Sequence, residues 1–159
     1  MVSCAIALGS NLGDSLNILE DSLQRLTADR NISLTSLSNW YRTRPIGPPQ
    51  PDYFNGCAIL EVKSLTPHQL LATLLGVENQ FGRVRDRFWG PRTLDLDLLL
   101  YGDLILNSPS LEIPHPRMRE RAFVLVPLAS IAPDWIEPVT KLSIAQLLER
   151  VDISGVRLI

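Results

Sequence analysis

The stretch Pro91–Asp103, PRTLDLDLLLYGD, places two aspartates two residues apart in an otherwise apolar segment. In a β-strand alternate side chains share a face, so Asp95 and Asp97 point to one side and the leucines next to them to the other. The same alternation predicts that Leu100 joins the leucine side and Tyr101 the aspartate side. At a spacing of about 6.6 Å the carboxylates repel by about 2.5 kcal/mol at an effective dielectric constant of about 20. The strand therefore has either a wet face that screens the charges or a cation that neutralises them.

The composition fits one domain over residues 1–159, large enough to bury a core without disulfides or a structural metal. Hydrophobic residues make up 45% and charged residues 20%, and no apolar run approaches the roughly 20 residues of a membrane span. The start, MVSCAIALGSN, lacks the basic region of a secretory signal, and Cys4 and Cys57 have no metal-ligand spacing. We therefore expect a cytoplasmic protein with reduced thiols and no membrane partner.

Arginine is distributed unevenly along the chain. Seven of the thirteen arginines fall between Arg83 and Arg121, although the net charge is −2. Four of them lie in GRVRDRFWGPR, residues 82–92, immediately before the aspartates. A guanidinium matches phosphate geometry, so this loop indicates an anionic ligand; the alternative is a solvated loop with weak surface ion pairs. A polyphosphate with Mg²⁺ fits both features, because carboxylates supply one or two of the oxygen ligands of Mg²⁺ and phosphates and water supply the rest.

A second basic group follows in IPHPRMRERAF, residues 113–123. Its members are His115, Arg117, Arg119 and Arg121. These side chains are candidates to reach the same phosphates from the other side of a cleft. The alternative is that the histidine is a rigid turn residue between two prolines and that the arginines solvate a short helix.

Hydrophobic periodicity predicts the element order βαββαβ of the ferredoxin-like split βαβ arrangement. Thr66, Pro67 and Gln69 supply an N-cap, a proline at the first helical position and a capping-box partner for the second helix. In GSNLGD, which lacks the spacing of a phosphate loop, Gly9 and Gly13 are interpreted first as residues required by backbone geometry. The expected strands are Val2–Leu8, Ile32–Thr43, Phe54–Val62 and the Asp95 segment, and the expected helices are Asp14–Ala28, Pro67–Phe81, Phe123–Ile131 and Ser143–Val151.

The chain carries four separated motifs, GSNLGD, YRTRPIGPPQPDYFN, WGPRTLDLDLLLYGD and IPHPRMRERAFVLVPLASIAPD. Together they resemble the motifs of the 6-hydroxymethyl-7,8-dihydropterin pyrophosphokinases of folate synthesis, over essentially the whole chain. The resemblance implies an α+β fold with a ferredoxin-like βαββαβ core and additional C-terminal helices in a single three-layer domain. It also implies transfer of the β,γ-diphosphate of ATP to the hydroxymethyl oxygen of the pterin, with release of AMP.

The resemblance further implies which residues bind the metal and the nucleotide. Asp95 and Asp97 would hold two Mg²⁺ ions, and together with Arg83 and Arg92 they would form the catalytic set. The residues implied to contact ATP are Glu78, Arg83, Arg85, Trp89, Arg92, Leu98, His115 and Arg121. Three features depart from the family pattern: Phe88 replaces a common basic residue, the arginine loop is one residue short, and Arg44 replaces a residue that is often proline.

A further set is implied to bind the pterin. Its members are Gly9, Thr43, Pro45, Ile46, Tyr53, Asn55, Trp89 and Phe123. Tyr53 and Phe123 would stack on the two faces of the flat ring, because an aromatic bicycle gains from offset stacking. Asn55 would hydrogen-bond the polar edge of the ring, which would otherwise be left unpaired on burial.

Two other classes of function remain open from the residues alone. A βαββαβ domain also occurs as an RNA-binding module, although LDLDLLLY presents acids where such a module carries exposed aromatic residues. A nucleotide or metal sensor without catalytic activity is the second alternative. The expected partners are the small-molecule substrates ATP and reduced pterin alcohol, with no nucleic acid, and the chain is expected to be a monomer.

Overall fold

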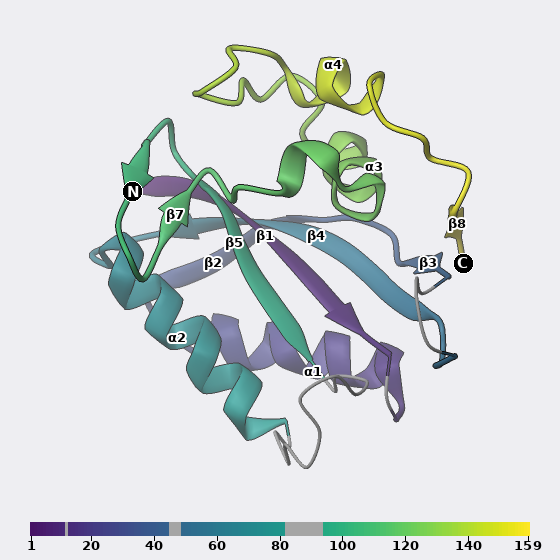
Figure 1. The fold of residues 1–159 in the computed structure, drawn as a ribbon. Coiled ribbons are helices and arrows are strands. Elements are labelled where there is room, and N and C mark those ends of the chain that lie inside the picture. The colour runs from purple at the N-terminus through teal and green to yellow at the C-terminus, as the bar shows by residue number, and fades with distance from the viewer. Residues whose placement is uncertain (12, 45–48, 82–93) are drawn as a thin grey trace.

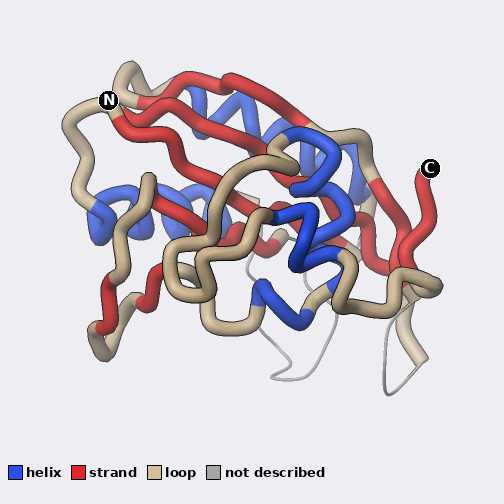
Figure 2. The backbone as a smooth tube through the Cα atoms, turned by 90° about the horizontal axis from the view of Figure 1, so that it is seen from above, coloured by secondary structure: helices blue, strands red, loops and turns tan. Residues whose placement is uncertain are grey.

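We describe the protein with a computed structural model, which describes residues 1–11, 13–44, 49–81 and 94–159. Figures 1 and 2 show its elements from two directions. The strands are β1 (Val2–Ser10), β2 (Ile32–Leu37), β3 (Tyr41–Thr43), β4 (Tyr53–Val62), β5 (Asp95–Tyr101), β6 (Leu106–Asn107), β7 (Glu112–Ile113) and β8 (Val156–Leu158). The helices are α1 (Ser15–Thr27), α2 (Pro67–Gln80), the short 3-10 helix η1 (Met118–Glu120), α3 (Ala122–Ile131) and α4 (Ile144–Leu148).

The main sheet is antiparallel and has β1 near its middle (Figure 1). On one side β1 pairs with β4, and on the other it pairs with β5. β4 also pairs with β2 and with β3, and β3 pairs with β8. Because β4 lies between β1 and β2, the first βαβ unit is split, which confirms the predicted ferredoxin-like core.

The strand predicted over Ile32–Thr43 is two strands, so that prediction was wrong at its centre. Ser38 donates its backbone N–H to the carbonyl of Cys57 (2.9 Å), and its hydroxyl accepts the N–H of Cys57 (2.9 Å). In a regular ladder the N–H of Cys57 would donate to a backbone carbonyl, but here it donates to the side chain of Ser38. The chain bends after Ser38, and β3 then brings Thr43 beside Tyr53 of β4.

Helices cover both faces of the main sheet, which gives the predicted three layers (Figure 1). On one face α1 and α2 pack against the sheet around the fully buried side chains of Ile6, Leu19 and Leu70. On the other face α3 and α4 pack around Ala5 and Leu125, which are also fully buried. Among the described residues, no helix combines the length and the apolar content that crossing a membrane requires.

The start of α2 follows the predicted capping chemistry. Thr66 accepts the N–H of Gln69, whose side chain accepts the N–H of Thr66, so the capping box of α2 is confirmed. Ser143 and Gln146 form the same reciprocal pair at α4, which is shorter than the predicted helix because it ends at Leu148. The pairs β6–β7 and β3–β8 were not predicted, since strands of two or three residues show no periodicity.

A bulge in β5 changes the predicted alternation of its side chains. Leu98 is opposite Ile6 whereas Leu100 is opposite Ala5, so Leu99 is an extra residue on β5. As a result Leu100 packs on the α3 side and Tyr101 turns to the α1 and α2 side, the reverse of the prediction. The two aspartates precede the bulge and share one face as predicted.

Candidate active site

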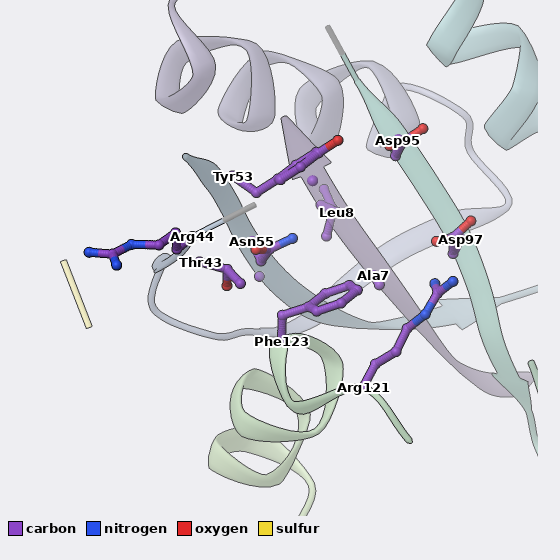
Figure 3. Close-up of a pocket in the computed structure, with 12 residues that line it drawn as sticks. Ala7, Leu8, Thr43, Arg44, Tyr53, Asn55, Asp95, Asp97, Arg121 and Phe123 are labelled. Atoms are coloured by element: carbon purple, nitrogen blue, oxygen red, sulfur yellow. The ribbon is translucent and has the colours of Figure 1, made fainter. Parts of the chain in front are cut away.

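The end of β1 brings the polar residues of its two neighbours together. Gly9 is opposite Asn55 of β4 on one side and Asp95 of β5 on the other. Two residues earlier, Ala7 is opposite Asp97. The small side chains of β1 leave the face of the sheet open at this point, so the carboxylates and the carboxamide border a common space on the α3 side (Figure 3).

A cavity of about 310 Å³ occupies this space. The residues that line it come from β1, β3, β4, β5 and the start of α3: Ala7, Leu8, Gly9, Thr43, Arg44, Tyr53, Asn55, Gly56, Asp95, Asp97, Arg121 and Phe123. Five of the residues predicted to bind pterin are in this set, together with both predicted metal ligands. The structure therefore brings residues from distant parts of the sequence to one pocket, which we call the sheet cavity.

Two aromatic side chains flank the sheet cavity. Tyr53 projects from β4 and Phe123 from the first turn of α3, and Figure 3 shows Asn55 between them. Both residues are half-buried, and both line the cavity. The Arg121 guanidinium lies 5.5 Å from the centre of the Phe123 ring, a cation–π distance, and in the view it extends toward Asp97.

Two oxygen atoms in the wall of the sheet cavity are buried without a hydrogen-bond partner in the described residues. They are the carboxamide Oδ1 of Asn55 and the hydroxyl Oγ1 of Thr43. Such a group costs about 1–3 kcal/mol when it stays unpaired. Because both atoms accept hydrogen bonds, the wall suits a ligand that presents N–H or N–H₂ donors along one edge.

Two glycines that line the sheet cavity leave room for neighbouring side chains. A Cβ on Gly9 would lie 3.1 Å from Nδ2 of Asn55, and a Cβ on Gly56 would lie 2.5 Å from the Trp40 ring. Gly9 therefore serves close packing of a side chain, whereas Gly13, with a φ of +76°, has the turn conformation predicted for the motif. Gly56 is not among the predicted residues, and its only signal in the sequence is a glycine inside a strand pattern.

A second cavity, of about 530 Å³, lies along the outer edge of β5, and we call it the edge cavity. It is lined by residues of α2, β5, β6, β7 and the segments next to β7: Leu71, Leu75, Glu78, Asp95, Leu96, Asp97, Leu98, Asn107, Ser108, Pro109, Ser110, Leu111, Glu112, His115 and Pro116. Three residues predicted to contact ATP are in this set, namely Glu78, Leu98 and His115. Asp95 and Asp97 are the residues that both cavities share.

The environment of His115 in the edge cavity favours its neutral form. Burial lowers the pKa of its imidazole, and Arg121 and Arg117 lower it further while Asp97 and Glu112 oppose them. Its Nδ1 accepts the backbone N–H of Arg117 (3.2 Å). The proton of the neutral ring is therefore assigned to Nε2, which can donate a hydrogen bond to a ligand.

Arg119 lines neither the sheet cavity nor the edge cavity. Its Nε and one terminal nitrogen both donate to Oε1 of Glu137, at 2.9 and 2.6 Å, and the Glu137 carboxylate is completely buried. The prediction that Arg119 could reach phosphates is wrong, because the guanidinium neutralises a buried acid instead. Arg121, two residues on, lines the sheet cavity.

Several predicted residues lie outside the described residues. They are Pro45, Ile46, Arg83, Arg85, Trp89 and Arg92. Within the described residues, no three His, Cys, Asp or Glu side chains are grouped so that they could hold a metal ion by themselves. Two carboxylates alone suit a hard cation that takes its remaining oxygen ligands from phosphates and water, which is the usual chemistry of Mg²⁺.

Comparisons with known proteins agree with this chemistry. Residues 5–133 match the family model for 7,8-dihydro-6-hydroxymethylpterin-pyrophosphokinase. Proteins named 2-amino-4-hydroxy-6-hydroxymethyldihydropteridine pyrophosphokinase are 52% identical in Synechocystis sp., over 95% of this chain and 77% of the relative, and 46% identical in Haemophilus influenzae, over 87% and 86%. The fold matches a crystal structure of wild-type Plasmodium falciparum HPPK-DHPS with a TM-score of 0.75 at 11% identity, over 94% of this chain and 44% of that one. This chain thus spans less than half of that solved chain.

Proposed function

The chain belongs to the 7,8-dihydro-6-hydroxymethylpterin-pyrophosphokinase family, and from this premise we propose that its two cavities hold the pterin and ATP on either side of Asp95 and Asp97. Members of the family transfer a diphosphoryl group from ATP to the hydroxymethyl group of the reduced pterin in folate biosynthesis, leaving AMP. The observation that carries the proposal is that these two aspartates line both cavities. A group transferred between ligands in the two cavities would pass their carboxylates.

The sheet cavity suits the pterin. Tyr53 and Phe123 would stack on the faces of the ring. The unpaired acceptors of Thr43 and Asn55 would receive hydrogen bonds from the amino and ring N–H groups, which removes the cost of leaving those acceptors buried alone. Gly9 would provide the space beside Asn55. We propose that Pro45, Ile46 and Trp89 complete this pocket.

The edge cavity suits the nucleotide. Leu98 offers apolar surface there, and the Nε2 proton of His115 can donate to a phosphate or sugar oxygen. Arg121 would approach the phosphates from the α3 side, where its guanidinium extends toward Asp97 (Figure 3). We propose that the remaining ATP contacts come from Arg83, Arg85, Trp89 and Arg92.

We propose that Asp95 and Asp97 hold two Mg²⁺ ions, which fits their oxygen-only donor set. Bound magnesium would neutralise phosphate charge and favour an in-line displacement. The chain itself would chiefly position and neutralise the reactants, since phosphoryl transfer depends mainly on alignment and charge stabilisation. In keeping with this, no histidine or lysine lines the sheet cavity in the described part of the chain.

The proposed assembly is a monomer in the cytoplasm. Cys4 and Cys57 are free and buried, and burial raises the pKa of Cys4 to about 12, which keeps this thiol unreactive. Sedimentation at micromolar concentration should give the mass of one chain, and a mass of two would contradict the proposal.

The function is tested by product analysis. Wild-type protein incubated with Mg²⁺, ATP and the reduced pterin alcohol should release AMP, whereas ADP would indicate an ordinary kinase and binding without product would indicate a sensor. Asp97→Asn should slow AMP formation at least about 1,000-fold, since several kcal/mol of metal-dependent stabilisation would be lost. Asp103→Asn, on an exposed residue of the turn after β5, is the matched control and should keep the wild-type rate.

A further inference from the structure

The outer edge of β5 is held by side-chain and loop groups of the edge cavity. β5 is an edge strand of the main sheet, and it pairs with β1 on its inner side. On the other edge, the N–H of Leu96 donates to Oε2 of Glu78 at 2.7 Å, and the carbonyl of Leu99 accepts the N–H of His115 at 3.0 Å. An edge strand without such partners presents unpaired backbone groups.

The hydrogen bond from Leu96 to Glu78 is made at the position between the two aspartates. Leu96 is the residue between the two aspartates, and Asp95 is the first residue of β5. On the β1 side Asp95 is opposite Gly9, a residue with no side chain to hold it. A bond to the N–H of Leu96 fixes the peptide group that joins Asp95 to Leu96, and with it the start of the strand.

The burial of Glu78 also needs a reason. Its side chain is only 5% exposed, near the end of α2 and beside the core residues Leu74 and Val77. It lines the same cavity as Asp95, Asp97 and Glu112, so four acidic residues border one cavity, although no three of them are grouped closely enough to hold a metal ion by themselves within the described residues. Burying a charge near like charges is unfavourable unless it accepts strong hydrogen bonds. A backbone N–H bound to a carboxylate is such a bond.

We propose that Glu78 is a positioning residue, which fixes the backbone between Asp95 and Asp97 so that both carboxylates keep the spacing at which they bind a metal–nucleotide complex. This rests on the proposed function and differs from the direct nucleotide contact that the family resemblance implies. In this role the carboxylate accepts a hydrogen bond from the N–H of Leu96, so the presence of an acceptor oxygen matters more for positioning than the negative charge. Partners that orient metal ligands typically change metal affinity by 10–100-fold when they are removed.

The test compares two substitutions by two measurements. Glu78→Gln keeps an acceptor oxygen of the same reach, whereas Glu78→Ala removes it. Hydrogen exchange at the Leu96 amide, followed by NMR, reports the bond itself. Calorimetric binding of a non-hydrolysable ATP analogue, with Mg²⁺ and with EDTA, separates metal-dependent from metal-independent affinity. Glu20→Ala and Glu20→Gln, on an exposed position of α1, are matched controls.

We expect Glu78→Ala to speed exchange of the Leu96 amide at least about 10-fold and to weaken Mg²⁺-dependent analogue binding about 10-fold or more, with unchanged binding in EDTA. Glu78→Gln should stay within about threefold of wild type in both measurements. Equal losses in Mg²⁺ and EDTA would indicate a direct nucleotide contact and overturn the proposal. The proposal would also be overturned if Glu78→Gln bound the analogue as weakly as Glu78→Ala does, or if hydrogen exchange of the Leu96 amide were unchanged in Glu78→Ala.

Two further results keep this inference separate from the proposed function. If wild-type protein shows no Mg²⁺-dependent analogue binding, then the function fails and not only the role of Glu78. If Glu78→Ala does not fold, as far-UV circular dichroism would show, the decision rests on Glu78→Gln: near wild-type values support the positioning role, and weakened Mg²⁺-dependent binding contradicts it.

Discussion

The hydroxyl of Thr43 is buried in the wall of the sheet cavity without a partner among the described residues. In the free protein this oxygen has lost water and gained nothing, which costs about 1–3 kcal/mol. A site that binds a donor-rich ring accepts that cost, because the ligand supplies the missing hydrogen bond. Stability and function therefore make opposite demands on this residue.

Thr43→Val separates the two demands, since valine has nearly the same shape and no hydroxyl. We expect the variant to unfold with a free energy equal to or up to about 1 kcal/mol above that of wild type, because an unpaired polar group has been removed. We also expect the KM for the pterin to rise about 5-fold or more, with the KM for ATP unchanged. Urea denaturation and steady-state kinetics measure these quantities, and a loss of stability with normal kinetics would show that the hydroxyl has a structural partner.

Glycine positions show how far single residues can be read from a sequence. Gly13 follows the rule that a tight turn needs a positive φ, and the GSNLGD motif alone predicts it. Gly9 and Gly56 are required by Asn55 and Trp40, which approach from other strands. A glycine inside a strand pattern marks position 56 as unusual, but the neighbour that requires it is distant in sequence, so the reason for Gly56 could not be derived from the sequence.

At the level of the elements, β3 and β8 place two like charges opposite each other. Arg42 faces Arg157 across the antiparallel pair, while Arg42 also lies 4.0 Å from Asp52 and 5.4 Å from the centre of the Phe54 ring. Directly opposed like charges destabilise a strand pair, and opposite charges stabilise it by about 0.2–1 kcal/mol. The pairing of β8 with β3 is therefore less stable than it would be with opposite charges at these two positions.

Arg157→Glu should strengthen this strand pair. We expect the free energy of unfolding to rise by about 0.5–1 kcal/mol at low salt and the gain to shrink at 1 M salt, because the charges are exposed and are then screened. Thermal unfolding at the two salt concentrations measures the effect. Arg150→Glu, on an exposed residue outside the strand pair, is the control. An equal gain in both variants would mean that only net charge matters.

The elements were predictable where local chemistry decides and not where pairing decides. The α2 capping box and the aspartate alternation follow from neighbouring residues, and both are confirmed. The bulge at Leu99 depends on the register with β1, and the break after Leu37 depends on the bonds between Ser38 and Cys57. A single sequence carries no direct information on such register, because each pairing involves residues far apart in the chain.

At the level of the whole molecule, motif order predicted which residues would meet but not how space is divided between them. Asn55, Phe123 and Asp97 come together because β1 is flanked by β4 and β5 and covered by α3 (Figures 1 and 3). No pattern in the sequence predicted that the aspartates lie between two cavities rather than on the wall of one. That arrangement follows from β5 being an edge strand, with the sheet cavity on its face and the edge cavity along its side.

A buried ion pair between Arg119 and Glu137 stabilises the layer of α3 and α4 that covers one face of the sheet. Glu137 lies in the segment between α3 and α4, and its carboxylate accepts from Arg119 through one oxygen and from the N–H and hydroxyl of Thr140 through the other, each at 2.6 Å. The pair joins η1, which precedes Arg121, to the C-terminal part of the chain. Burial alone would raise the pKa of Glu137, but these hydrogen bonds outweigh it and lower the pKa below its usual 4.5.

Glu137→Gln tests this pair through the pH dependence of stability. The substitution turns one acceptor oxygen into an NH₂ group, which cannot accept from either partner, so we expect a loss of about 2 kcal/mol at pH 7. A depressed carboxyl pKa stabilises the folded state above the unfolded pKa, and that contribution disappears as the pH falls through 4.5 toward the lower folded value. The stability difference between wild type and variant should therefore be constant from pH 7 to about 5.5 and shrink on further acidification. Urea unfolding across this range, with exposed Glu149→Gln as control, measures it, and a difference that stays constant down to pH 3 would show that the Glu137 charge does not stabilise the fold.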